Sequence, residues 1–230
     1  MPLRDVIVER IRTHGPITFA EYMDLALYHP ELGYYARADR RSGRAGDFFT
    51  SVDVGPLFGT LLARQFAEMS RLSEAPRFDL VEAGAGRGRL ARDVLDAAAR
   101  DDPDLYAVVR LTLVERSPDA RAAQPSVLGP HVAKLAESTA ELPADVQGVI
   151  FGNELLDALP CHSVVMSKAG LREVYVDVSG HRLVERLLDP SSREIAAYLE
   201  RAGARLRPGW RAEVNLAAWV AENSSWASCP

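Results

Sequence analysis

Hydrophobic and polar residues change their spacing several times along this chain, and each change marks an expected element. Apolar residues recur every three or four positions over residues 3–11, which predicts an amphipathic helix that the Gly-Pro pair at 15–16 ends. The T-x-x-E pattern at 18–21 is a capping box and predicts a second helix directly after it. A third, strongly amphipathic helix is expected to start near residues 53–56. The first part of the chain is therefore expected to be helical.

The middle of the chain alternates short apolar runs with segments of helical spacing. Helices are expected up to about Arg100 and over residues 119–124. Strands are expected at residues 78–82, 110–115, 131–135 and 146–151. This alternation predicts a parallel sheet with right-handed crossovers, and such sheets bind ligands at the carboxyl ends of their strands.

Beyond Pro160 the pattern changes to strict alternation, which predicts short antiparallel strands at residues 162–166, 171–178 and 181–187. A helix is expected to open at Asp189-Pro190 and to close near Gly203. A last helix is expected to hold Val214, Leu216, Ala217, Trp219 and Val220.

Composition places the chain among ordinary globular proteins. Its 230 residues, 47% of them hydrophobic, suit one domain of ordinary size or a domain plus a small appendage. The net charge of −5 argues against a general polyanion binder. Cys161 and Cys229 form no metal or redox motif, and the five histidines show no metal-ligand spacing, so no metal is expected. No signal peptide, transit peptide or membrane span is evident in the sequence, so a cytoplasmic location is expected.

Three alternating glycines follow the first strand of the predicted sheet. The spacing is Glu82-x-Gly84-x-Gly86-x-Gly88, directly before a helix. Glycines let the backbone turn sharply and approach a ligand, and the helix N-terminus points free N–H groups at whatever lies there. A dinucleotide fingerprint has a different spacing, with its third glycine one residue later. A strand, turn and helix with purely structural glycines remains an alternative.

Acidic and amide side chains follow two other predicted strands. Glu115 ends the second strand, where a carboxylate can accept hydrogen bonds from both hydroxyls of a ribose. Alternatively, Glu115 only begins the turn at Ser117-Pro118. Asn153 and Glu154 follow the fourth strand, so these residues are expected at the same edge of the sheet as the glycines.

Several stretches in this order resemble the MidA-like family of S-adenosylmethionine (SAM) methyltransferases, whose mitochondrial members assist respiratory complex I assembly. The stretches are Tyr28-His29-Pro30, Gly33-Tyr34-Tyr35, Gly46-Asp47-Phe48, Thr50-Ser51, Phe58-Gly59, Glu82 to Gly88, Val114-Glu115 with Ser117, and Asn153-Glu154 through Asp157-Ala158-Leu159-Pro160. Ala83 and Ala85 depart from the family's usual loop without removing a glycine or an acid. Family members continue into further sheet strands where this chain stops, so a C-terminal truncation is expected.

The resemblance implies an α/β fold with a Rossmann-like class I methyltransferase core, an N-terminal helical extension and a β-hairpin insertion, with the last sheet strands missing. It implies SAM as cofactor, held by Glu82, Gly84, Gly86, Gly88, Glu115 and Asn153. The expected parts are an extension at 1–72, a SAM-binding core at 73–160, an antiparallel insertion at 161–189 and C-terminal helices at 190–230.

The resemblance also implies methyl transfer to arginine side chains of a protein, with a respiratory-complex subunit as one expected substrate. Carboxylates can orient a guanidinium through bidentate hydrogen bonds, so Glu154 and Asp157 are the expected catalytic residues, with Asn153 positioning the acceptor. Asp157 alternatively caps a helix. Asp47 and Tyr35 are candidates for a lid over the acceptor.

Other functions stay open on the sequence. An RNA or small-molecule methyltransferase would share the core, and the arginines at 37–44 could contact phosphate, although the net acidity counts against nucleic acid. A nicotinamide oxidoreductase is disfavoured by the glycine spacing. An inactive assembly protein of the same fold is a third alternative. A homodimer is open, and no membrane partner is expected.

Overall fold

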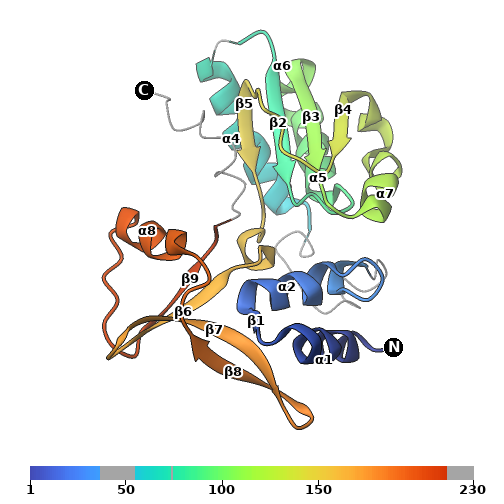
Figure 1. The fold of residues 1–230 in the computed structure, drawn as a ribbon. Coiled ribbons are helices and arrows are strands. Elements are labelled where there is room, and N and C mark those ends of the chain that lie inside the picture. The colour runs from blue at the N-terminus through green and yellow to red at the C-terminus, as the bar shows by residue number, and fades with distance from the viewer. Residues whose placement is uncertain (37–54, 74, 217–230) are drawn as a thin grey trace. The chain divides into compact units, whose positions relative to one another are not determined.

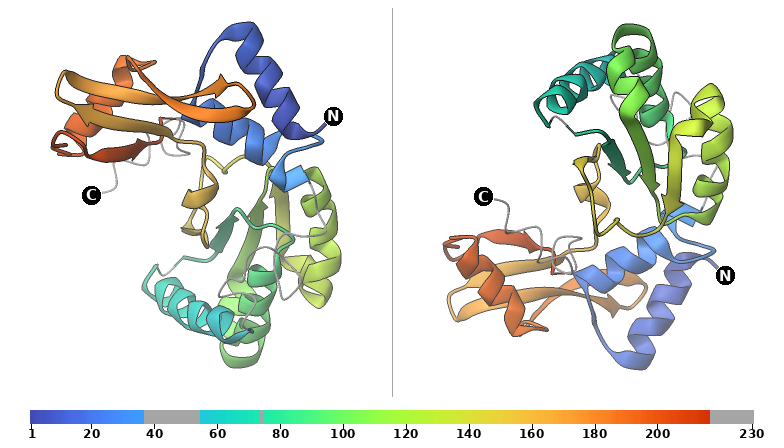
Figure 2. Two further views of the ribbon diagram at one scale, coloured as in Figure 1. Left: turned by 90° about the horizontal axis from the view of Figure 1, so that it is seen from below. Right: turned by 90° about the horizontal axis from the view of Figure 1, so that it is seen from above.

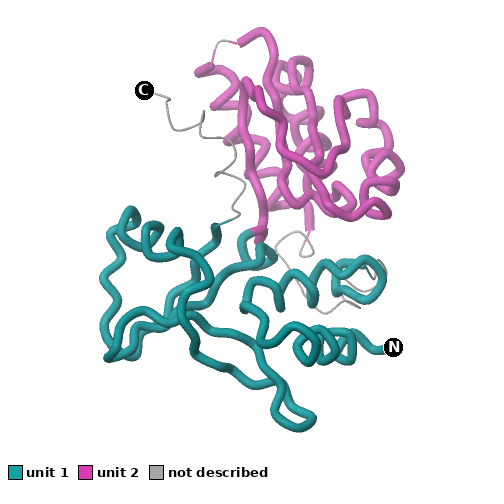
Figure 3. The backbone as a smooth tube through the Cα atoms, viewed as in Figure 1, with its two compact units in different colours: residues 1–37, 156–230 teal, residues 38–155 magenta. Residues whose placement is uncertain are grey.

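The structure is a computed structural model that describes residues 1–36, 55–73 and 75–216. It divides into two compact units, one made of residues 1–37 with 156–230 and the other of residues 38–155 (Figure 3). Each unit is described by itself.

The unit of residues 38–155 is built on a parallel sheet of four strands in the order β4-β3-β2-β5 (Figure 1). Its elements are α4 (Leu57–Ser73), β2 (Phe78–Ala83), α5 (Arg89–Asp101), α6 (Pro103–Val108), β3 (Val109–Val114), α7 (Pro118–Leu128), the 3-10 helix η3 (Gly129–Lys134), β4 (Leu135–Thr139) and β5 (Gly148–Phe151). The predicted α/β class and parallel sheet are confirmed. The carboxyl ends of the four strands meet at one edge of this sheet.

Helices pack on the sheet through alternate strand residues. Figure 2 shows helices of this unit lying against its sheet. Phe78 and Leu80 of β2 point to the same face and are buried in one cluster with apolar residues of α4 and α5. The ring of Phe66 of α4 packs at a tilt of 53° against that of Phe151 of β5, with centroids 5.0 Å apart. This core fixes the helices on the strands whose ends carry the candidate site.

Gly148 begins β5 where its backbone passes against β2. A Cβ built there would lie 2.6 Å from the amide nitrogen of Asp79, and closer still to its carbonyl oxygen. Because backbone atoms cannot move aside as a side chain can, Gly148→Ala should lower the free energy of unfolding by about 2–4 kcal/mol. Urea unfolding measures this loss. Gly203→Ala is the control, since a Cβ there meets no described atom, and equal losses in the two variants would contradict the close approach.

The other unit contains an antiparallel sheet in which β7 is the central strand. Its elements are α1 (Leu3–His14), β1 (Ile17–Thr18), α2 (Phe19–Tyr28), η1 (Tyr34–Ala36), η4 (Leu156–Ala158), β6 (His162–Ser167), β7 (Gly170–Ser179), β8 (Arg182–Leu188), α8 (Arg193–Arg201) and β9 (Arg211–Val214). Strand β7 pairs with β8 along one side and with β6 and β1 along the other, and β9 pairs with β6. The three strands expected between residues 162 and 187 are confirmed.

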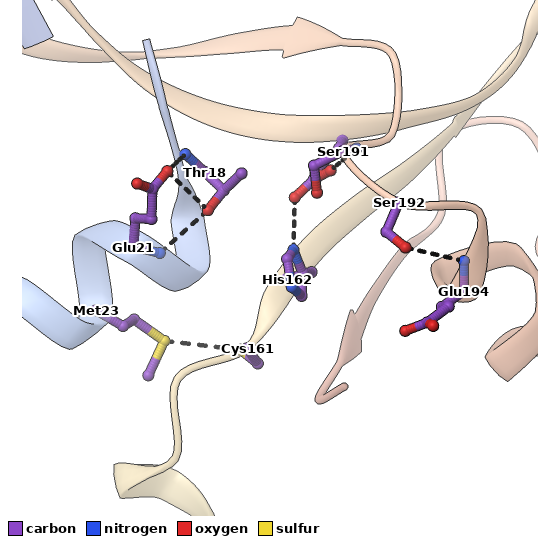
Figure 4. A network of polar contacts seen from close by, with 9 residues as sticks. Thr18, Glu21, Met23, Cys161, His162, Ser191, Ser192 and Glu194 are labelled. Carbon is purple, nitrogen blue, oxygen red and sulfur yellow. Dashed lines mark hydrogen bonds and ion pairs between the residues drawn. The ribbon is translucent and has the colours of Figure 1, made fainter. Parts of the chain in front are cut away.

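Polar contacts hold this second sheet to its helices (Figure 4). The predicted capping box is present, because Thr18 accepts from the Glu21 amide and Glu21 accepts from the Thr18 amide. Glu173 is fully buried on β7 and accepts hydrogen bonds from His162 and from the Ser191 amide. Burial alone would raise the pKa of Glu173, but these hydrogen bonds lower it, so the carboxylate stays charged and ties the β8–α8 connection to the sheet.

Three expected elements differ from the structure. Residues 131–135 were expected as a strand, but η3 occupies Gly129–Lys134 and the strand is Leu135–Thr139. The helix expected to open at Asp189-Pro190 begins at Arg193, where Ser192 is its N-cap. The expected last helix is wrong at its start, because Val214 ends β9. Residues 217–230 lie outside the described part of the chain.

The structure divides the chain into two units, and the four-part division expected from the sequence stays a proposal. In the described ranges, no helix has the length and apolar character needed to cross a membrane. The same ranges contain no cluster of three or more metal-ligating side chains.

Candidate functional site at the sheet edge

The loop after β2 turns sharply at three glycines. Gly84, Gly86 and Gly88 have φ values of 70°, 53° and 82°, which side chains with a Cβ rarely adopt. The amides of Gly84 and Ala85 both donate to the Val114 carbonyl, at 2.9 and 3.0 Å. The loop is therefore fixed to the end of β3, and α5 begins directly after it.

The three glycines differ in what surrounds them. A Cβ at Gly84 would contact Leu155 at 2.8 Å, and one at Gly88 would contact Leu113 at 2.9 Å. A Cβ at Gly86 would meet no described atom within 4 Å. The loop is thus packed on side chains at both ends and open at its centre, as a backbone cradle for a ligand requires.

Glu115 follows β3 and binds the centre of this loop. Its Oε2 atom accepts from the Gly86 amide at 2.9 Å, and its Oε1 atom accepts from the Ser117 amide at 2.8 Å. The side chain is only partly buried, and each carboxylate oxygen has further acceptor capacity. Glu115 therefore shapes the turn at Ser117 and also holds a carboxylate beside the glycines, while its predicted contact with a ribose stays a prediction.

Glu82 lies beneath the loop, near the end of β2. It is 4% exposed, and its Oε2 atom accepts from the Ala91 amide in the first turn of α5 at 3.1 Å. Burial raises the pKa of Glu82 to about 8, with a further increase from the charges of Asp93 and Glu115, while the Ala91 hydrogen bond opposes the shift. Glu82 is therefore mostly protonated at neutral pH, and it satisfies one of the free N–H groups of the helix.

Gln124 of α7 and Ser138 of β4 also belong to this network, and neither was singled out from the sequence. Gln124 donates to the Gly86 carbonyl at 2.8 Å and accepts from the Ser138 hydroxyl at 2.6 Å. A single glutamine in an alanine-bearing helix carries no pattern that predicts such a contact.

The residues expected to contact the acceptor are divided between the two units. Asn153 and Glu154 follow β5 at the same edge of the sheet, and Glu154 is exposed and has a φ of 51°, unusual for a residue with a side chain. Asp157 belongs to the other unit, in η4. Tyr35 lies in that unit too, stacked on Tyr28 with centroids 5.2 Å apart. Asp47 lies outside the described residues.

The edge of the parallel sheet thus brings together the glycine loop, the Glu115 carboxylate and the N-terminus of α5. The open face at Gly86 admits a ligand against the backbone, and Glu115 offers acceptors suited to a pair of hydroxyls. Glu82, neutral and hydrogen-bonded to Ala91, leaves no unpaired buried charge below the loop. These residues fit an adenosyl ligand with a ribose and an amino-acid part.

Similar solved structures include two from one organism. A Burkholderia thailandensis protein crystallised bound to S-adenosyl-homocysteine superposes with a TM-score of 0.78 at 31% sequence identity, covering 96% of this chain and 57% of that one. A native structure from the same organism gives a TM-score of 0.74, also at 31% identity, with 96% and 56% covered.

Curated relatives are similar over most of this chain. The mouse "Protein arginine methyltransferase NDUFAF7, mitochondrial" is 30% identical over 226 residues, which are 87% of this chain and 51% of the relative. The Caenorhabditis elegans homologue of that name is 34% identical over 203 residues, covering 77% and 46%. The chain spans about half the length of the curated relatives it matches.

A family model described as "Putative S-adenosyl-L-methionine-dependent methyltransferase" matches residues 61–224. That range contains the glycine loop, Glu115 and Asn153-Glu154, which together form the sheet edge described above. Because the match covers well over half of the sequence, the chain belongs to this family of S-adenosyl-L-methionine-dependent methyltransferases.

Proposed function

We propose that the chain binds SAM at the glycine loop and transfers its methyl group to an arginine side chain of a protein. The observation that carries the proposal is the hydrogen bond between the Gly86 amide and the Glu115 carboxylate, because it joins the loop to an acidic group whose oxygens can accept from ribose hydroxyls. The names of the relatives, which are protein arginine methyltransferases, support the choice of acceptor.

The loop and Glu115 would share the binding of the cofactor. The α5 N-terminus and the backbone at Gly86 would receive its amino-acid part, while the Glu115 oxygens accept from the ribose hydroxyls. SAM supplies an electrophilic methyl group on a positively charged sulfur. The protein's part is then to hold the acceptor in line with that carbon and to exclude water.

Glu154 is the residue we propose to orient the acceptor. Its carboxylate is exposed at the end of β5, held by a backbone with positive φ, and can accept two hydrogen bonds from a guanidinium. It would also take the proton that the arginine nitrogen loses as its bond to the methyl carbon forms. Asn153 and Asp157 remain proposed partners in this step, as do Asp47 and Tyr35 for a lid. The acidic balance of the chain, −5, favours a cationic acceptor.

Glu154→Gln should lower the methylation rate by about 100-fold, because the amide cannot take up a proton. The affinity for SAM should stay unchanged, since the proposed cofactor contacts are made by other residues. The measurement is mass spectrometry of an arginine-bearing peptide incubated with SAM, together with calorimetry of cofactor binding.

Glu141→Gln, at an exposed acid in the β4–β5 connection, is the matched control. A methylated RNA in a parallel incubation, with unmodified peptide, would contradict the protein acceptor while leaving the methyltransferase function. The predicted role in respiratory-complex assembly stays a prediction.

A further inference from the structure

Gln124 is a fully buried polar side chain whose two amide atoms are both used. It has 0% exposure, and its Nε2 atom donates to the Gly86 carbonyl while its Oε1 atom accepts from Ser138. The orientation of the amide is forced, because a carbonyl oxygen can only accept and so must face the nitrogen. Leaving either contact unmade would strand a buried polar group, so the arrangement is specific.

The peptide groups on both sides of Gly86 are held by different elements. The Gly86 N–H donates to Glu115 after β3, and its carbonyl accepts from Gln124 on α7. Gly86 itself has a φ of 53°, and no described atom lies within 4 Å of its Cβ position. The two hydrogen bonds therefore add to the backbone bonds of Gly84, Ala85 and Gly88 in orienting the centre of the loop.

Ser138 completes a continuous chain of hydrogen bonds. The order is Ser138 hydroxyl to Gln124 oxygen, Gln124 nitrogen to Gly86 carbonyl, and Gly86 amide to Glu115 carboxylate. Hydrogen bonds in such a chain polarise and strengthen one another in a buried setting. This series of hydrogen bonds runs from β4 through α7 and the glycine loop to the end of β3.

We propose that Gln124, supported by Ser138, is a positioning residue for the cofactor site. It sets the orientation of the Gly86 peptide and, through it, the position of the Glu115 carboxylate. The proposal rests on the proposed function only in naming SAM as the ligand. The two hydrogen bonds that hold Gly86, which we call the clamp, are present in the chain without a ligand.

The variant Gln124→Glu distinguishes a positioning role from a purely structural one, because only the positioning role predicts that ligand affinity changes with pH. The protonated carboxyl can still donate to the Gly86 carbonyl, whereas the ionised form can only accept and repels it. Burial raises the pKa of such a carboxyl, since Gln124 is fully buried, and this brings the change into an accessible pH range. S-adenosylhomocysteine affinity of the variant, measured by calorimetry from pH 5.5 to 8.5 and divided by the wild-type value, should fall about 10-fold or more with rising pH.

Dividing by the wild-type value removes the pH dependence that the two proteins share, including that of Glu82. Gln147→Glu, at an exposed glutamine, is the control and should give a flat ratio. A flat ratio for Gln124→Glu would overturn the proposal. If that variant fails to fold, Ser138→Ala takes its place, with an expected loss of about 3- to 10-fold in affinity, and an unchanged affinity would overturn it equally.

A ligand-free measurement separates this proposal from the proposed function. Hydrogen exchange of the Gly86 amide should be faster in Gln124→Glu than in wild type at pH 8, and equal at pH 5.5 after correction for intrinsic exchange. Faster exchange in the variant, together with no S-adenosylhomocysteine binding by the wild-type chain, would reject the cofactor and keep the role of Gln124 in holding Gly86. Unchanged exchange would reject the clamp whatever the ligand.

Discussion

Glu115→Ala is expected to weaken SAM binding by about 100-fold, equivalent to roughly 2.7 kcal/mol. The carboxylate accepts from the amides of Gly86 and Ser117, so its removal frees the loop and also takes away the proposed acceptors for the ribose hydroxyls. Hydrogen bonds to a charged acceptor contribute about 1.5–3 kcal/mol each, and the loss of more than one supports an effect of this size. Isothermal calorimetry measures it directly.

Glu137→Ala on β4 is the matched control for Glu115→Ala. Glu137 is an exposed acid on the strand next to β3, so its removal changes the net charge equally without touching the loop. Circular dichroism should show both variants folded. An affinity of Glu115→Ala within about threefold of the control would show that the ribose is held elsewhere.

Glu82→Gln is expected to remove a pH dependence from the stability of the protein. The pKa of Glu82 is raised from 4.5 to about 8 by burial, so between these values the folded chain binds more protons than the unfolded chain. The free energy of unfolding therefore falls as pH rises through this window. Glutamine imitates the protonated carboxyl and does not titrate, so the variant should lose this fall.

The difference in unfolding free energy between Glu82→Gln and wild type should grow in favour of the variant by about 1 kcal/mol for each pH unit from 5 to 8. Urea unfolding at several pH values measures the difference. Glu141→Gln changes an exposed acid, so its unfolding free energy should vary with pH in parallel with that of wild type. A parallel curve for Glu82→Gln would mean that Glu82 is ionised in the folded chain.

The place of the candidate site residues in the sheet was predictable from local patterns. Glycines 84, 86 and 88 follow an apolar run, and Glu115 ends the next one, so the parallel order of strands places them at one edge. The sequence could not show that Glu115 already accepts from the Gly86 amide. Nor could it indicate Gln124, because its partners Gly86 and Ser138 lie 38 and 14 positions away from it in the sequence.

The elements that differed from expectation were short runs whose conformation depends on distant contacts. His131 was placed in a strand, but it is buried in η3 between Tyr106 and Asp96, at 2.9 and 2.8 Å, and Pro130 favours the helical start. Ala212, Val214 and Leu216 also alternate, which fits a strand as well as a helix. Val214 lies in a strand because the backbone there pairs with β6.

We propose that the edge formed by the glycine loop and Glu115 binds SAM. A crystal structure of the protein with S-adenosylhomocysteine would show where the ligand lies. We predict that the ligand lies against the backbone at Gly86, with both ribose hydroxyls within hydrogen-bonding distance of the Glu115 carboxylate. A ligand bound elsewhere, or a ribose held without Glu115, would contradict the account.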